Sequence, residues 1–163
     1  MVTKRQVHEA GHRRKFLAVV DKTPECVKAV KYAASRCSSI DADLVLVFVI
    51  QPADFQHWLN VEQVMRTEAL ADAEAELAKA ADLVREWAGI HAQLVVREGT
   101  VTGEITNLIE EDPDIALLIL AAGDSKDGPG PLVSSISGSS AAFPIPVTVV
   151  PATLTDQDIA DLV

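Results

Sequence analysis

The chain has 163 residues, of which 48% are hydrophobic and only 4% aromatic, and its formal net charge is −10. This length suits one domain with a substantial core, built from aliphatic side chains that favour helices packed on a sheet. So acidic a body excludes nucleic acid and anionic membranes as partners. No apolar run reaches the roughly 20 residues of a membrane span, and no apolar leader segment follows the N-terminal charges. We therefore expect a cytoplasmic protein.

The charge is unevenly distributed. Residues 1–15 carry about +4 and the remainder about −14. We expect residues 1–14 to form a basic, solvated N-terminal tail, residues 15–151 to form the domain, and residues 152–163 to form an acidic C-terminal tail. Cys26 and Cys37 fall eleven positions apart on one expected helix, about 16 Å along its axis. They are therefore not expected to pair, and both are interpreted as small buried or semi-buried residues.

The first half of the chain alternates apolar runs with helical patterns. FLAVVD (16–21) is typical of a buried strand that ends at an acid. A helix should follow, with Thr23 as its cap and Pro24 at its first position. The stretch 42–50 predicts a strand covered on both faces, and 61–88 predicts a long charged helix ended by Gly89. The apolar stripes expected on the two helices are Val27, Val30, Ala34 and Cys37, then Val61, Val64, Met65, Ala69, Leu77, Ala81, Val84 and Ala88.

The second half repeats this alternation. Strands are expected at 91–99, 115–122 and 145–150, and a helix capped by Thr102 should end at Pro113. Thr155 with Asp158 predicts a short final helix. The alternation of strands and helices predicts one doubly wound, five-stranded parallel sheet with helices on both faces.

Ligands of such sheets bind beyond the carboxyl ends of the strands. Asp21, at the end of the first strand, would accept a hydrogen bond from a ribose hydroxyl or an adenine amino group, or hold magnesium through water. The alternative is that the Asp21 side chain faces solvent before a helix and binds no ligand. Gln51 ends the second strand and Gly123 the fourth.

The stretch GDSKDGPGPLVSSISGSS (123–140) has the parts of an anion site. Its glycines would let the backbone approach a ligand closely, and a helix opening near residue 132 would present free N–H groups beside two serine hydroxyls. A loose connection is the alternative. The candidate phosphate-binding residues are Gly123, Gly128, Gly130, Ser134 and Ser135.

Together these stretches resemble the universal stress protein family over about residues 14–151. The resemblance rests on FLAVVDKTPECVKAVKYAASRC, DLVLVFVI, VREGTVTGEITNLIEED and IPVTVVP. It implies a Rossmann-like fold of the adenine nucleotide alpha hydrolase type, Asp21 near adenine and ribose, and the Val49 backbone against adenine. The full set of candidate nucleotide-binding residues is Asp21, Lys22, Val49, Gly123, Gly128, Gly130, Ser134 and Ser135.

Nucleotide-binding members of the family carry a phosphate motif of glycine, two residues, glycine, nine residues, glycine and then Ser or Thr, and this motif is altered here. Gly128, nine residues and Gly138-Ser139 copy its second half, but a helix opening at Gly138 would leave barely one turn before the strand at Ile145. Anchoring on the Pro146-Val147 strand instead predicts a helix at about 132–142. The Gly-Ser pair of the motif then falls on Val133-Ser134, so the serine is kept and the glycine is lost.

Three functions remain open at this point. The first is a stress-response sensor or adaptor that binds ATP, with magnesium. The second is a non-binding member, with no cofactor, that acts through protein contacts. The third is a slow ATP hydrolase or adenylate-transfer domain, although no nucleophile motif and no third metal ligand beside His8 and His12 is seen. The last strand is short and apolar, so a homodimer through its edge is expected, formed by Val147, Thr148, Val149 and Val150.

Overall fold

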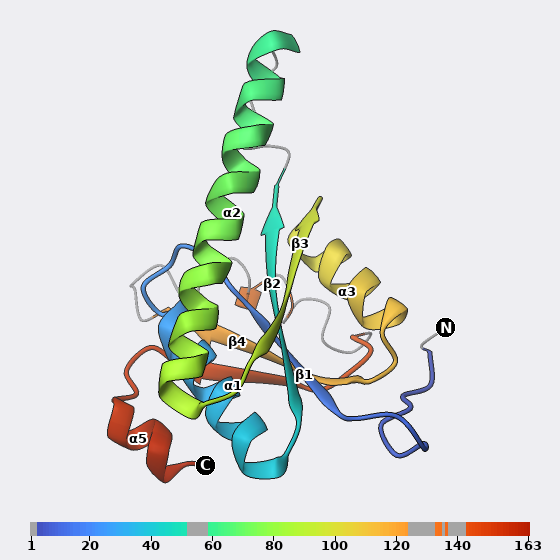
Figure 1. The fold of residues 1–163 in the computed structure, drawn as a ribbon, viewed down its shortest axis with the longest axis vertical. Helices are drawn as coiled ribbons and strands as arrows, with labels where there is room; N and C mark the ends of the chain where they lie inside the picture. The colour runs from blue at the N-terminus through green and yellow to red at the C-terminus, as the bar shows by residue number, and fades with distance from the viewer. Residues whose placement is uncertain (1–2, 52–58, 124–132, 135, 137–142) are drawn as a thin grey trace.

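A computed structural model describes residues 3–51, 59–123, 133–134, 136 and 143–163, with the side chains of 59–62 excepted. Its centre is a five-stranded parallel sheet in the order β3-β2-β1-β4-β5 (Figure 1). The predicted fold class is therefore confirmed. The strands are β1 (Lys15–Val19), β2 (Asp43–Ile50), β3 (Ala92–Glu98), β4 (Ile115–Ala122) and β5 (Val147–Pro151).

The strand order reverses between β1 and β4. The chain first builds outward from β1 through β2 to β3, then crosses to the other side of β1 for β4 and β5. Because small molecules bind such sheets at the carboxyl ends of the strands beside this reversal, the segments that follow β1, β2 and β4 are the ones to search for a site.

Helices cover both faces of the sheet (Figure 1). One face carries α1 (Cys26–Ile40) and α2 (Leu59–Ala88), with the short α5 (Asp156–Asp161) beside α1; the other face carries α3 (Val101–Glu111). Since side chains of a strand alternate between faces, each strand feeds both cores. In β1, Phe16 and Ala18 pack with α1 and α2, whereas Leu17 and Val19 pack with α3.

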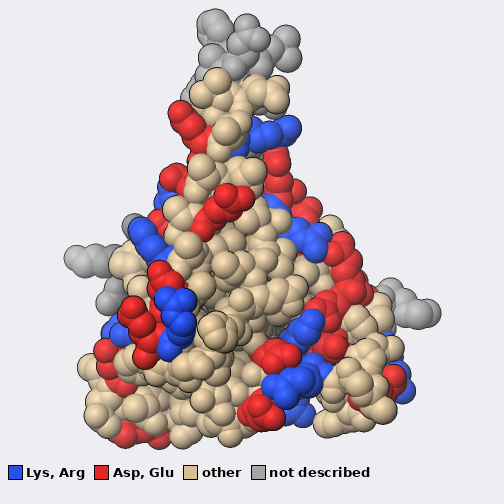
Figure 2. All heavy atoms as spheres, in the orientation of Figure 1, with Lys and Arg blue, Asp and Glu red and all other residues tan. Residues whose placement is uncertain are grey.

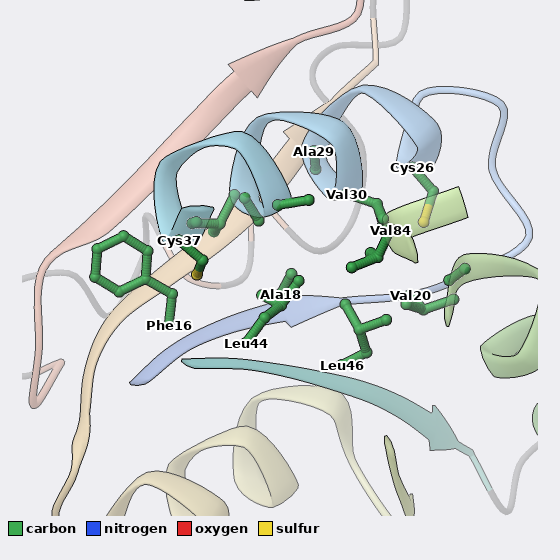
Figure 3. Close-up of a cluster of buried hydrophobic side chains, with 14 of the residues drawn as sticks. Phe16, Ala18, Val20, Cys26, Ala29, Val30, Cys37, Leu44, Leu46 and Val84 are labelled. Carbon is green, nitrogen blue, oxygen red and sulfur yellow. The ribbon is translucent and has the colours of Figure 1, made fainter. Parts of the chain in front are cut away.

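Both cysteines lie in the core between α1 and the sheet. Figure 3 shows Cys26 and Cys37 among the side chains that α1 directs toward Ala18 of β1 and Leu44 of β2. Both thiols are free and buried, as expected from their spacing. Burial raises the pKa of Cys26 to about 11 and that of Cys37 to about 12.

The start of α1 differs from the prediction. Thr23 does not cap the helix, which begins at Cys26 after an N-cap residue, Glu25, with no side-chain cap hydrogen bond. The reason is that the Thr23 hydroxyl donates instead to the Asp21 carboxylate. Val27, expected in the core stripe, is 43% exposed because it lies on the outward side of the first turn.

The stripe predicted for α2 is only partly right. Leu77 and Val84 are buried as expected, but Val64 is 57% exposed. Figure 1 shows that the N-terminal part of α2 extends past the ends of the strands. The neighbouring Met65 still packs beside Ile50 of β2, but Val64 remains exposed. Figure 2 shows acidic and basic side chains along the outer side of α2, the solvated surface that its composition predicts.

The other predicted helix ends are mostly right. Gly89 ends α2 with a left-handed φ of 69°, and Thr155 with Asp158 forms the expected capping box of α5. Thr102, however, does not cap α3. The N-cap is Thr100, and Thr102 lies in the first turn.

The N-terminal segment is not a freely solvated tail, which corrects the expectation from its composition. The guanidinium of Arg5 donates to the main-chain carbonyls of Ile109 at 2.7 Å, Ile115 at 3.1 Å and Asp112 at 3.2 Å. These carbonyls lie at the end of α3 and the start of β4, where a helix leaves its last acceptors unpaired. One arginine therefore satisfies them and holds the segment against the domain.

The acidic C-terminal segment also packs on the domain. Ile159 of α5 is fully buried, and Asp156 accepts a hydrogen bond from Lys31 of α1 at 2.9 Å. The Lys31 ammonium lies 4.7 Å from the centre of the Trp87 ring, an arrangement typical of a cation–π contact. Residues 156–161 are therefore attached to α1 by one apolar and one charged contact.

Candidate functional site

A cavity of about 450 Å³ opens at the carboxyl edge of the sheet. Its volume lies within the range of about 300–1,000 Å³ that is usual for small-molecule sites. Three segments meet there: the end of β1, the end of β2 and the start of α3. The described lining residues are Val19, Val20, Asp21, Thr23, Phe48, Val49, Gln51, Thr100, Val101 and Thr102.

Asp21 is fixed by the turn that follows β1. Its Oδ1 accepts the backbone N–H of Thr23 at 2.9 Å and the Thr23 hydroxyl at 2.5 Å, a local turn that Asp side chains commonly form. Among the described residues, no group donates a hydrogen bond to Oδ2. One carboxylate oxygen thus orients the side chain, and the other has no donor among the described residues.

Val49 lies where β2 runs past the end of β1. The ladder between the two strands ends at the pair Val19–Val47, with the N–H of Val20 donating to the carbonyl of Val47 at 2.8 Å. On its other side β2 continues to pair with β3, with Val49 opposite Arg97. The main chain of Val49 therefore borders the cavity on the side where β1 has ended, and strand backbone in that position offers a planar ligand both a donor and an acceptor.

Lys22 points elsewhere. Its ammonium pairs with Asp72 of α2 at 2.5 Å, and this contact raises the pKa of Lys22. It borders a neighbouring groove between α1 and α2 rather than the cavity that Asp21 and Val49 line. Of the predicted set, the structure brings Asp21 and Val49 together and places Lys22 apart from them.

The predicted phosphate residues are only partly described. Gly123 follows β4 at the same edge of the sheet as Asp21, across the reversal of strand order. Gly128, Gly130 and Ser135 lie outside the described residues.

The next described positions along the chain are helical. Val133, Ser134 and Ile136 have helical backbone, within the helix expected at about 132–142. The Val133 side chain is buried in the core under the sheet, and Ser134 is exposed. The valine that replaces the glycine of the motif therefore packs inward, with its bulk in the core.

Reasoning from the sequence overlooked several lining residues. Thr23, Gln51, Thr100 and Thr102 add hydroxyl and amide groups to the cavity. Gln51 was noted only as a strand end, and both Thr23 and Thr102 were assigned to helix caps. The available signal was position along the chain, since each of these residues lies within three residues of a strand's carboxyl end or a helix start.

Other kinds of site find no support in the part of the chain that is described. Within it, no three His, Cys, Asp or Glu side chains gather closely enough to hold a metal ion. His12 contacts Asp114 at 2.7 Å, and His8 is exposed in the same turn-rich segment. No described helix combines the length and apolar character that crossing a membrane requires.

These observations define a doubly wound α/β protein with a ligand-sized cavity at the carboxyl edge of its sheet. Its particular family follows from comparison: the model of the Universal stress protein family matches residues 12–151. The chain belongs to this family. A comparison with curated proteins gave no match.

Solved structures share the fold at low sequence identity. UspA from Lactobacillus plantarum is 17% identical, with a TM-score of 0.70 over 86% of this chain and 99% of that one. A universal stress protein from Archaeoglobus fulgidus in complex with dAMP is 16% identical, with a TM-score of 0.60 over 84% and 97%. A further universal stress protein structure, in complex with cAMP, is 15% identical, with a TM-score of 0.63 over 86% of this chain and 98% of that one.

Proposed function

We propose that this protein binds an adenine nucleotide, ATP, in the cavity at the carboxyl edge and works as a stress-response sensor or adaptor in the cytoplasm. The observation that carries the proposal is that one cavity unites the Asp21 carboxylate with the protruding end of β2. Two structures of the same fold were determined with cAMP and dAMP, which supports an adenine nucleotide as the ligand class.

The described residues fit the nucleoside part of the ligand. Val19 and Phe48 supply apolar walls for a planar base, and the main chain of Val49 would pair with the base edge. The Oδ2 atom of Asp21 would accept from a ribose hydroxyl. This assigns recognition of the nucleoside to residues that the fold already holds in place.

The phosphates would extend toward Gly123 and the segment after it. Asp21 is the one carboxylate among the described lining residues, so a magnesium ion would be held mainly by the phosphates themselves. Because the described lining residues carry a single charge, their role would be to bind and orient the nucleotide. The presence of bound nucleotide would then be the signal that the sensor or adaptor transmits.

Thermal unfolding with and without millimolar magnesium-ATP tests the proposal. A ligand that binds only the folded state adds about 2.7 kcal/mol of stability at a hundred times its dissociation constant. Magnesium without nucleotide and magnesium-GTP are the controls. No shift at millimolar magnesium-ATP would refute nucleotide binding and leave protein contacts as the function of the domain.

We also propose that the protein is a homodimer through β5. This strand is at one edge of the sheet, and its outward apolar side chain, Val149, is 42% exposed. Beside it an apolar cavity of about 310 Å³ includes Phe143, Ile145 and Val147. An apolar edge strand is a template for pairing with another chain, and a second copy of β5 would cover it. Sedimentation at micromolar concentration should show a dimer, and a monomer would contradict this arrangement.

A further inference from the structure

A second candidate ligand cavity, shallow and widely open to solvent, has a volume of about 490 Å³ and lies near the amino ends of β1 and β4, away from the carboxyl edge. Its apolar side is formed by Val7 of the N-terminal segment, Phe16 of β1, and Ala116 and Leu117 of β4. Phe16 is buried, whereas the other three are partly exposed. The cavity therefore offers an apolar surface that the N-terminal segment helps to build.

The polar side of this cavity is basic, in a protein whose net charge is −10. Arg5, His8 and Arg14 line it. Arg5 is already engaged, because its guanidinium donates to carbonyls of Thr3, Ile109, Asp112 and Ile115. It adds positive potential to the cavity but few free donors.

Arg14 is different. Among the described residues, no acceptor or carboxylate pairs with its side chain, which is exposed. Its neighbours are matched: Arg13 pairs with Asp41 and Asp43, and Lys15 pairs with Asp112 at 2.7 Å. The nearby Asp114 contacts His12. These carboxylates are thus engaged by other side chains, and the Arg14 guanidinium is left beside an apolar surface.

We propose that this second cavity binds a small organic carboxylate with an apolar body. A guanidinium pairs with a carboxylate through two parallel hydrogen bonds, and the apolar side chains would cover an alkyl chain or ring. A single unpaired guanidinium matches a single negative charge, which distinguishes this ligand from a nucleotide polyphosphate. His8 can add one hydrogen bond at the rim.

The test is a calorimetric titration of the full chain with octanoate, with octan-1-ol as the uncharged comparison. Saturable octanoate binding is expected, weaker by about tenfold for the alcohol because it lacks the charge-assisted pair. The Arg14→Gln variant should lose about tenfold in octanoate affinity. The matched variant Arg13→Gln, which removes a neighbouring guanidinium that pairs with aspartates, should stay within about twofold.

Four results would overturn the proposal. The first is no binding of octanoate at millimolar concentration, and the second is equal affinity of the unmodified protein for octanoate and octan-1-ol. The third is displacement of octanoate by magnesium-ATP, which would place it in the carboxyl-edge cavity. The comparison with octan-1-ol uses the unmodified chain, so it decides the question even if the Arg14 variant fails to fold. The fourth is unchanged octanoate affinity in a folded Arg14→Gln protein, which would contradict the role of this guanidinium.

Discussion

Replacing Asp21 by asparagine separates the two tasks of its carboxylate. The oxygen that accepts from the Thr23 N–H and hydroxyl is retained in asparagine, so the turn after β1 should survive with little loss of stability. What is lost is the negative charge of a side chain that lines the cavity. Hydrogen bonds to charged groups contribute about 1.5–3 kcal/mol against about 0.5–1.5 for neutral pairs, so nucleotide affinity should fall by about tenfold.

The magnitude can be read from thermal unfolding. At a magnesium-ATP concentration a hundred times the dissociation constant, the unmodified protein should gain about 2.7 kcal/mol. At the same concentration a tenfold weaker variant should gain about 1.4 kcal/mol, close to half. Asp21→Ala should show the same loss of ligand response and, in addition, a lower stability without ligand by about 1 kcal/mol, because both hydrogen bonds from Thr23 disappear.

A matched control is Asp43→Asn, the same chemical change at the amino end of β2, where Asp43 pairs with Arg13. It should leave the gain from magnesium-ATP unchanged. Full ligand stabilisation in Asp21→Asn would refute the role of this carboxylate in the site. An asparagine variant as unstable without ligand as the alanine variant would refute the assignment of one oxygen to the turn.

The remaining predictions concern three other features. Lys22→Gln should change nucleotide affinity by less than about twofold, because the lysine pairs with α2 and an exposed ion pair contributes little; a tenfold loss in a binding assay would place Lys22 in the site. Cys26 and Cys37 should react with a thiol reagent such as DTNB only after unfolding, since burial raises both pKa values. The thiols should also ionise at lower pH in the unfolded chain than in the folded one, so the free energy of unfolding should decrease as pH rises from about 9 toward 12. Rapid labelling of the native protein would contradict the burial of the two thiols. Val149→Arg on β5 should convert the dimer to a monomer in sedimentation, whereas Leu94→Arg on the opposite edge strand should not, and equal effects would reject the β5 interface.

The sheet and its helices could be predicted because the signals are local and strong. β4 is an unbroken aliphatic run, and its predicted bounds match those observed. The start of α1 was missed because two local patterns compete for the same residue: Thr23 closes a turn with Asp21 and does not cap the helix. Helical periodicity also cannot show where a helix extends past the end of the sheet, and for this reason Val64 was assigned to the core.

The site was predictable at its strand ends and less so elsewhere. Asp21 follows from the rule that ligands lie beyond the carboxyl ends of parallel strands, whereas Val49 was expected only from the resemblance to the universal stress protein family. Thr100, by contrast, joins the cavity only because α3 starts beside the ends of β1 and β2. The attachment of Arg5 to three carbonyls could not be foreseen from composition, which shows a basic segment but not the acceptors that α3 presents to it.

The most direct test of nucleotide binding is a titration of isotope-labelled protein with magnesium-ATP, followed through its backbone amide NMR signals. Saturable changes should appear at Thr23, Val49, Gln51 and Thr102, which line the carboxyl-edge cavity, and amides at the amino end of the sheet should stay constant. Unchanged spectra at millimolar magnesium-ATP, or changes confined to other surfaces, would contradict the account.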